Sequence, residues 1–287
     1  MDSQTNHQSG DGQLFIVATP IGNLADITYR AVDTLRSVDL IAAEDTRNSR
    51  KLLQHYAIDT PMITLHEHNE QAMLEQLKTR LLAGCDIALI SDAGTPLISD
   101  PGYRLVRFLR QHGIRVTPIP GASSVITALC AAGLPTDHFR FCGFLPRSGK
   151  HRQQELQRIA AADETIILLE SPRRLLDTLT QLRDGCGGQR QVVVARELTK
   201  LHESFISDTL AATIDHFSQH PPRGEIVLLV APAAAETLAL NDQQILDCLN
   251  SASMQSLPPS ARAKAVANML GIKRASVYAL MTAESRD

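Results

Sequence analysis

Short apolar runs separated by amphipathic segments dominate the first half of the chain. Residues 14–18 (LFIVA) contain no polar side chain, as is typical of a strand buried on both faces of a parallel sheet. The alternation continues to residue 132 and indicates an α/β domain. It predicts strands at residues 14–18, 40–43, 62–65, 87–90 and 115–119, and helices after Asp26 or Thr28 and at residues 70–82, 103–111 and 123–132.

A turn-rich stretch at residues 133–152 separates this domain from a second one. Gly133 and Pro135 end the preceding helix, and we set the boundary near Leu134. The following segments again alternate between apolar runs and amphipathic stretches, so we expect a second, smaller α/β domain with a mixed sheet. The predicted strands are residues 165–169, 192–195, 202–206 and 226–230, and the predicted helices are residues 152–161, 172–182 and 210–218.

The composition changes after an Ala-rich link at residues 231–239. Short amphipathic helices are predicted at residues 243–250, 261–270 and 274–281, and Gly271 separates the last two by a tight turn. This spacing resembles helix-turn-helix geometry, although the pattern is common. The expected division is a disordered tail at 1–12, an N-terminal α/β domain at 13–133, a C-terminal α/β domain at 134–233 and a small helical module at 234–287.

Composition and cysteine usage narrow the class of protein. Hydrophobic residues make up 44% and charged residues 21% of the chain, which favours neither disorder nor a membrane protein. The five cysteines are scattered and form no CxxC pair, which argues against a disulfide framework or a structural zinc site. The first dozen residues lack the features of a signal peptide. A reducing cytoplasm is the expected location.

The net charge of −3 does not indicate a nucleic-acid binder, so local charge matters more. A basic cluster without an intervening acid lies at the domain boundary and is a candidate phosphate site: Arg140, Arg147, Lys150 and Arg152. A second cluster lies in the terminal helices: Arg262, Lys264, Lys273 and Arg274. Either cluster is also compatible with an ordinary solvated face, the second more so.

The segment SDAGTPLISDPG at residues 91–102 follows a predicted buried strand. Glycine lets the backbone approach a ligand closely and proline fixes a loop, while Asp92 and Asp100 are hydrogen-bond acceptors. In α/β sheets, ligands bind beyond the carboxyl ends of the strands, where this segment lies. It is therefore a candidate binding loop. The competing interpretation is a tight connection whose carboxylates cap the next helix.

Eight motifs occur in order along the chain. They are VATPIGNLADIT (17–28), AAEDTR (42–47), SDAGTPLISDPG (91–102), PGASSVITAL (120–129), GFLPR (143–147), LLESPRRL (168–175), ARELTK (195–200) and GEIVLLV (224–230). In these motifs the chain resembles the ribosomal small subunit ribose-2′-O-methyltransferase I family, within the tetrapyrrole (corrin/porphyrin) methylase superfamily. The match extends over about residues 14–232.

The resemblance implies a fold of two α/β domains that binds S-adenosylmethionine in the cleft between them. Backbone groups from both domains would hold this cofactor. The positions that match the motifs are Pro20, Gly94, Thr95, Pro96, Ile98, Ser123, Ser124, Phe144, Leu145, Leu198, Glu225 and Ile226.

The resemblance also implies an activity, which is 2′-O-methylation of a decoding-centre cytidine in the 16S rRNA of the small ribosomal subunit. A homodimer is the superfamily expectation. The reaction needs an aligned hydroxyl and a group that takes its proton, and it needs no metal. The candidates for that group, left unranked, are Asp45, Asp92, Asp100, Glu170 and Lys200.

Other interpretations stay open. Internal ion pairs account equally well for the acid and base clusters around Asp45, Glu170 and Lys200. His66 and His68 lie on one side of an extended segment, where a polar loop explains them better than a metal does. A tetrapyrrole precursor methyltransferase would share the cleft, but it would carry a glycine-dense first loop where this chain has only Gly22. A non-catalytic RNA-binding assembly factor would retain the fold without methyl transfer.

Overall fold

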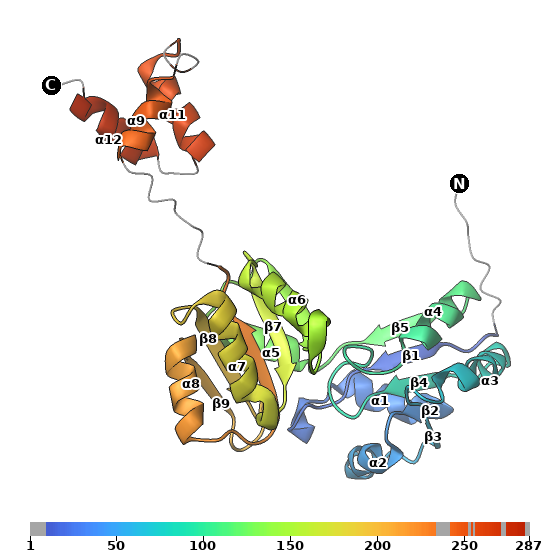
Figure 1. The fold of residues 1–287 in the computed structure, drawn as a ribbon. Coiled ribbons are helices and arrows are strands. Elements are labelled where there is room, and N and C mark those ends of the chain that lie inside the picture. The colour runs from blue at the N-terminus through green and yellow to red at the C-terminus, as the bar shows by residue number, and fades with distance from the viewer. Residues whose placement is uncertain (1–9, 234–241, 252–253, 255, 271–273, 285–287) are drawn as a thin grey trace. The chain divides into compact units, whose positions relative to one another are not determined.

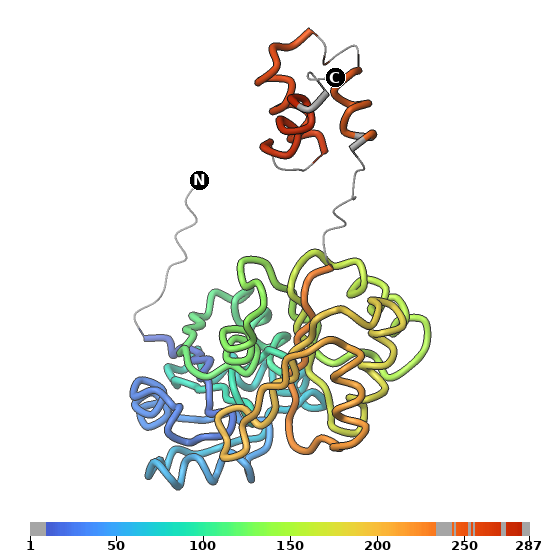
Figure 2. The backbone as a smooth tube through the Cα atoms, turned by 90° about the vertical axis from the view of Figure 1, so that its left-hand side faces the viewer, coloured from blue at the N-terminus to red at the C-terminus, as the bar shows by residue number. Residues whose placement is uncertain are grey.

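A computed structural model describes residues 10–233, 242–251, 254, 256–270 and 274–284 of the chain. Contacts between residues divide the chain into two compact units, residues 1–233 and residues 234–287. The first unit has two lobes, a blue-to-green one and a yellow-to-orange one, in both backbone views (Figures 1 and 2). Each lobe is built on one five-stranded sheet. This agrees with the α/β class predicted from the sequence.

The first sheet is entirely parallel, with strand order β3-β2-β4-β1-β5. Leu14 in the central strand lies opposite Ile87 on one side and Val116 on the other. All five predicted strands are confirmed to within one residue at each end. They are β1 (Leu14–Val17), β2 (Leu40–Ala43), β3 (Met62–Thr64), β4 (Ile87–Ile90) and β5 (Val116–Ile119).

Helices cover both faces of this sheet. Alternate residues of each strand point to opposite faces, so Leu14 and Val17 belong to different hydrophobic clusters. α3 (Glu70–Leu82) and α4 (Tyr103–Gln111) pack on one face; α1 (Tyr29–Ser37) and α2 (Thr46–His55) pack on the other. A short 3-10 helix, η1 (Leu24–Asp26), precedes α1, and the Thr28 hydroxyl caps α1 by accepting the Ala31 N–H.

The second sheet has strand order β6-β7-β10-β8-β9, in which β6 and β7 are parallel and the other pairs are antiparallel. The predicted mixed sheet is therefore confirmed. β6, however, lies within residues 133–152, where we predicted only a turn-rich link, and that prediction was wrong. The strands are β6 (Phe139–Phe144), β7 (Thr165–Glu170), β8 (Gln191–Arg196), β9 (Ser204–Thr209) and β10 (Ile226–Val230).

Four helices cover the second sheet. α6 (Gly149–Ala160), α7 (Pro172–Cys186) and α8 (Leu210–Gln219) pack on one face. α5 (Ser124–Ala131) packs on the other face, where Val125 and Leu129 contact the apolar side chains of β7, β8 and β10. By packing, α5 therefore belongs with the second sheet, although it precedes the expected boundary near residue 134.

The second unit contains α9 (Asp242–Leu249), α11 (Pro259–Leu270) and α12 (Arg274–Glu284) around a small core that includes Leu249, Val266 and Val277. The expected turn at Gly271 and the cation Lys273 lie outside the described residues, as do the first nine residues of the expected tail. Gly12, by contrast, donates its N–H to the Leu81 carbonyl at 2.8 Å. Among the helices described here, none combines the length and apolarity needed to cross a membrane.

Candidate functional site

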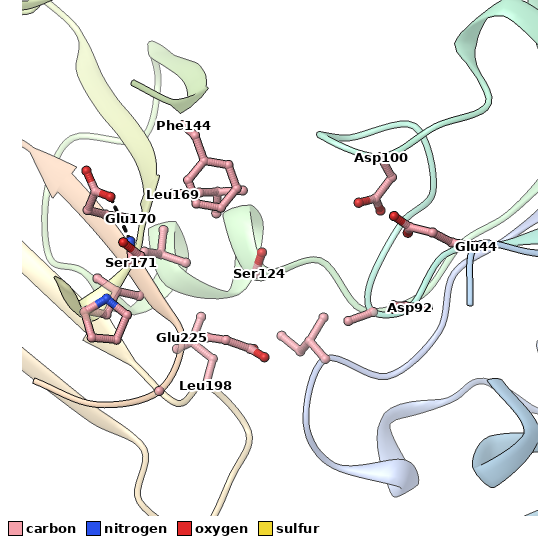
Figure 3. Close-up of a pocket in the computed structure, with 16 residues that line it drawn as sticks. Glu44, Asp92, Asp100, Ser124, Phe144, Leu169, Glu170, Ser171, Leu198 and Glu225 are labelled. Carbon is pink, nitrogen blue, oxygen red and sulfur yellow. Dashed lines mark hydrogen bonds between the residues drawn. The ribbon is translucent and has the colours of Figure 1, made fainter. Parts of the chain in front are cut away.

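A cavity of about 440 Å³ lies between the two lobes and is called the cleft below. The carboxyl ends of β2 and β4 supply one wall, and β6, β7 and β10 supply the opposite wall (Figure 3). It is lined by Ile21, Glu44, Asp92, Ala93, Asp100, Ser124, Phe144, Leu169, Glu170, Ser171, Pro172, Leu198, Gly224, Glu225, Ile226 and Val227. The predicted position beyond the strand ends is thus where the structure has its cleft.

The charged side chains that line the cleft are all acidic. They are Glu44, Asp92, Asp100, Glu170 and Glu225; Lys200 and Arg174, which do not line the cleft, pair with Glu225 at 3.3 Å and with Glu170 at 3.5 Å. Apolar side chains make up most of the remaining wall, which lowers the local dielectric and strengthens the effect of these charges. An apolar cleft with negative charge favours a ligand that is itself partly apolar and carries positive charge.

Glu44 and Asp100 point toward one another from the same wall of the cleft (Figure 3). Burial raises the pKa of Glu44, and the nearby carboxylates of Asp100 and Asp92 raise it further. Burial also raises the pKa of Asp100, and Asp92 adds to this, while a hydrogen bond from Ser91 lowers it. Both carboxylates therefore bind a proton more readily than an ordinary acid does. Glu44 belongs to the AAEDTR motif but was not among the predicted site residues.

Two of the candidate proton acceptors do not have the properties of a base. Asp45 caps α2, and a hydrogen bond from the Arg47 side chain lowers the pKa of Asp45 to about 2. Burial lowers the pKa of Lys200, but its hydrogen bonds and ion pairs with Glu197 and Glu225 outweigh burial and the net pKa is raised. Asp45 therefore stays ionised in its own ion pair, and Lys200 stays a cation.

Glu170 and Asp92 line the cleft, but other groups occupy their carboxylates. Glu170 is 3% exposed and accepts hydrogen bonds from the Thr178 hydroxyl at 2.6 Å and the Ser171 N–H at 2.8 Å. Asp92 accepts the Asp45 N–H at 3.1 Å and the Asn48 side-chain amide at 3.0 Å. Both acids hold loops of the cleft in place, which is an orienting role.

The predicted cofactor residues gather around the cleft and two adjoining cavities. Those that line the cleft are Ser124, Phe144, Leu198, Glu225 and Ile226. A small cavity that shares Ser124 with the cleft is lined by Gly94, Thr95, Ile98 and Ser123, and another that shares Glu225 is lined by Pro20. Leu145 lines none of these three cavities, and its side chain is 2% exposed within the core of the second lobe. Pro96 is also buried.

The members of the predicted basic cluster differ in exposure and in partners. Arg152 is 4% exposed, and its guanidinium donates to Gln181, Pro146 and Thr178 and pairs with Asp177. Arg140 pairs with Glu164 at 3.1 Å. The Arg152 guanidinium is therefore held by groups of the protein itself, although Arg152 lines one cavity together with Arg147, and its assignment to RNA binding stays a prediction. Arg147 and Lys150 are exposed at the start of α6.

The ARELTK loop reaches the cleft in a strained conformation. Glu197 and Thr199 have φ values of 50° and 65°, which side chains other than glycine rarely adopt. Glu197 is held there because its Oε1 accepts the Lys200 ammonium at 3.0 Å and the Glu225 N–H at 2.9 Å. Thr199 Oγ1 accepts the Asn23 N–H from the other lobe at 3.0 Å. The loop therefore ties both walls of the cleft together.

Gly224→Ala is expected to damage this loop. A Cβ at Gly224 would lie 2.1 Å from Glu197 Oε1, and Gly224 has a φ of +82°. We expect a loss of about 2 to 3 kcal/mol in the free energy of unfolding, measured by chemical denaturation. Gly187→Ala is the matched control, because Gly187 has a φ of +81° with nothing within 4 Å of an added Cβ. Equal losses in the two variants would show that the contact with Glu197 is unimportant.

Comparisons with known proteins show the class of protein to which this chain belongs. Residues 13–213 match the family model of the Tetrapyrrole (Corrin/Porphyrin) Methylases. Among solved structures, uroporphyrin-III-C-methyltransferase from Thermus thermophilus has a TM-score of 0.53 at 18% identity, covering 77% of this chain and 94% of that one. The methyltransferase CobJ has a TM-score of 0.59 at 18% identity, covering 78% and 95%. At this identity the likeness establishes the fold, which is that of the tetrapyrrole methylases.

Relatives of higher identity define the family. A Synechocystis protein named ribosomal RNA small subunit methyltransferase I is 48% identical over 270 residues, or 94% of this chain and 97% of that protein. An Escherichia coli O157:H7 protein of the same name is 47% identical over 281 residues, or 95% and 96%. The chain belongs to the ribosomal RNA small subunit methyltransferase I family of tetrapyrrole methylases. The resemblance drawn from the eight motifs is confirmed.

Proposed function

We propose that this protein transfers a methyl group from S-adenosylmethionine to the ribose 2′-hydroxyl of a decoding-centre cytidine in 16S rRNA. The observation that carries the proposal is the acid-lined, largely apolar cleft. S-adenosylmethionine carries a sulfonium, an ammonium and a carboxylate group, so its net charge is positive, and its adenine is flat and largely apolar. The charge and polarity of this cleft fit those features. The names of the relatives indicate that the methyl group is transferred to ribosomal RNA of the small subunit.

The residues of the cleft have distinct proposed roles. When bound, the cofactor supplies a methyl carbon on a good leaving group, so alignment and proton removal are left to the protein. Phe144, Leu169 and Leu198 supply the apolar wall, and Asp92 fixes the loop that follows β4. We assign proton removal to Glu44. Its raised pKa favours proton uptake, and three neighbouring acids contribute to that rise.

The affinity for S-adenosylmethionine is expected to fall on the order of fivefold between about pH 7 and about pH 5. Because the pKa values of Glu44 and Asp100 are raised, both lose their negative charge at a higher pH than ordinary carboxyls. Isothermal titration calorimetry at each pH measures the affinity. S-adenosylhomocysteine is the matched ligand, since it lacks the sulfonium charge and should depend less on pH. The same pH dependence for both ligands would refute this account of the cleft.

Arg147 and Lys150 are the two exposed members of the predicted RNA-binding cluster. Replacing both with alanine is expected to weaken binding to 16S rRNA and to reduce the slope of log K against log salt by about 0.7 per lost phosphate contact. Filter binding over a salt series measures the slope. The double variant of Arg107 and Arg110, both exposed on α4, is the control. An unchanged slope in the Arg147 and Lys150 variant would remove these residues from the RNA surface.

The tetrapyrrole alternative is disfavoured by the relatives, because those 48% and 47% identical to this chain are named ribosomal RNA small subunit methyltransferase I. The proposal is tested by offering labelled S-adenosylmethionine with undermethylated small subunits, naked 16S rRNA or uroporphyrinogen. We expect label on RNA. Label on the tetrapyrrole alone would overturn the proposal, and RNA retention without label would favour a non-catalytic assembly factor. The cytoplasm and a homodimer remain part of the proposed setting.

A further inference from the structure

A second cavity, of about 490 Å³, lies beside the cleft at the carboxyl ends of β2, β3 and β4. Glu44 and Asp100 line both cavities. We propose that the second cavity receives the target nucleoside of the RNA substrate, with its ribose at these shared carboxylates. The proposal rests on the proposed function, because it names where the acceptor of the methyl group binds. The proposal explains why both cavities are lined by Glu44, the residue assigned to proton removal.

Tyr103 gives the second cavity a surface on which a base can stack. It is the first residue of α4, lines the cavity and is 63% exposed, so its ring has no role in the core. Aromatic residues make up only 4% of the chain. His66 and His68 also line the cavity, with ring centroids 5.8 Å apart. Unpaired RNA bases are commonly held by stacking on such rings.

The cavity also contains acceptors for a base that carries an amino group. Glu67 is exposed there, and Glu70 is 4% exposed, with its Oε1 fixed by the Leu105 N–H at 2.8 Å. Carboxylates accept hydrogen bonds from the exocyclic amino group of cytosine. A cytosine base is therefore a better chemical match to this cavity than uracil, which presents a carbonyl at the same position.

The rim of the cavity is suited to the phosphate that accompanies a nucleoside. Arg104 lies there, exposed, in the first turn of α4. In the first turn of α4 the Leu105 N–H is already held by the Glu70 carboxylate, so the cationic group that this rim offers a phosphate is the Arg104 side chain. The neutral base and ribose can thus enter among carboxylates, while the anionic backbone remains at the cationic edge.

The test compares Tyr103→Ala, Tyr103→Phe and Tyr29→Ala. Tyr29 is the control because it is 92% exposed on α1 and outside this cavity. With undermethylated small subunits, we expect Tyr103→Ala to raise KM or lower kcat/KM by about tenfold or more. Tyr103→Phe keeps the ring and should match the wild type. The Kd for S-adenosylmethionine should be unchanged in all three variants.

A second pair of variants tests the rim. Arg104→Ala should raise KM for the subunits, whereas Arg107→Ala, on the same helix but outside the cavity, should not. Wild-type kinetics in both Tyr103→Ala and Arg104→Ala would overturn the proposed nucleoside site while leaving the proposed function intact. If the wild-type protein itself methylates no RNA, the proposed function fails and this inference fails with it. The two failures are therefore distinguishable.

Discussion

Glu44→Gln is expected to lower kcat for RNA methylation on the order of a hundred- to a thousandfold, the range typical of losing a general base. The substitution keeps the size of the side chain and removes its ability to take a proton. Because one of several acids in the cleft is lost, the Kd for S-adenosylmethionine should rise by less than about fivefold. Single-turnover rates and calorimetry separate the two effects.

Two further variants sharpen this prediction. Asp100→Asn should lower kcat by only about tenfold, since Asp100 raises the pKa of Glu44 without taking the proton itself. Asp33→Asn changes an exposed carboxylate on α1 and should leave kcat unchanged. A near wild-type kcat for Glu44→Gln together with an inactive Asp100→Asn would transfer the role of base from Glu44 to Asp100.

Arg152→Ala is expected to cost about 3 kcal/mol of unfolding free energy, the second large effect. Arg152 is buried and holds the segment after β6 to α7, with 3.0 Å hydrogen bonds to the Pro146 carbonyl and the Thr178 hydroxyl. Its loss removes the shorter of the two hydrogen bonds to the Pro146 carbonyl and the donor to the Thr178 hydroxyl, and it opens a void beside them. Thr178 in turn donates to Glu170 at the cleft, so the affinity for S-adenosylmethionine should also fall.

Lys150→Ala is the matched control, because Lys150 belongs to the same stretch of sequence but is exposed. Its unfolding free energy should stay within about 0.5 kcal/mol of the wild type. Chemical denaturation monitored by circular dichroism measures both variants. If Arg152→Ala unfolds like the wild type and instead loses RNA binding, then Arg152 acts at the surface, as the sequence had suggested.

The sheets were predictable because their strands are buried and uninterrupted. The short apolar runs at residues 14–18 and 226–230 are typical of buried strands. Most of the helices between the strands have a regular apolar face. α2 was missed because its first two turns, TRNSRK, are polar and its only apolar residues are Leu52 and Leu53. β6 was missed because its Arg140 and Gly143 interrupt the apolar pattern, and the pairing with β7 shifts register between Phe141 and Gly143.

The site was predictable in outline, since the loops after the strands converge on it. The roles of individual residues were less predictable, because they depend on contacts between residues that are distant in the chain. Arg152 looks like part of a basic surface until Asp177 and Thr178, on another helix, surround it. Glu44 looks like a member of an ion pair with Arg47 until the structure brings Asp100 beside it. Such differences in burial and charge environment leave no local signal in a single sequence.

The most direct test of the account is to identify the atom that receives the methyl group. Undermethylated small subunits are incubated with methyl-labelled S-adenosylmethionine under single-turnover conditions, and the rRNA is digested and analysed by mass spectrometry. We predict a single 2′-O-methylcytidine from the decoding centre, formed by the wild type and strongly reduced with Glu44→Gln. Label on a base atom, or on a nucleotide outside the decoding centre, would contradict the account.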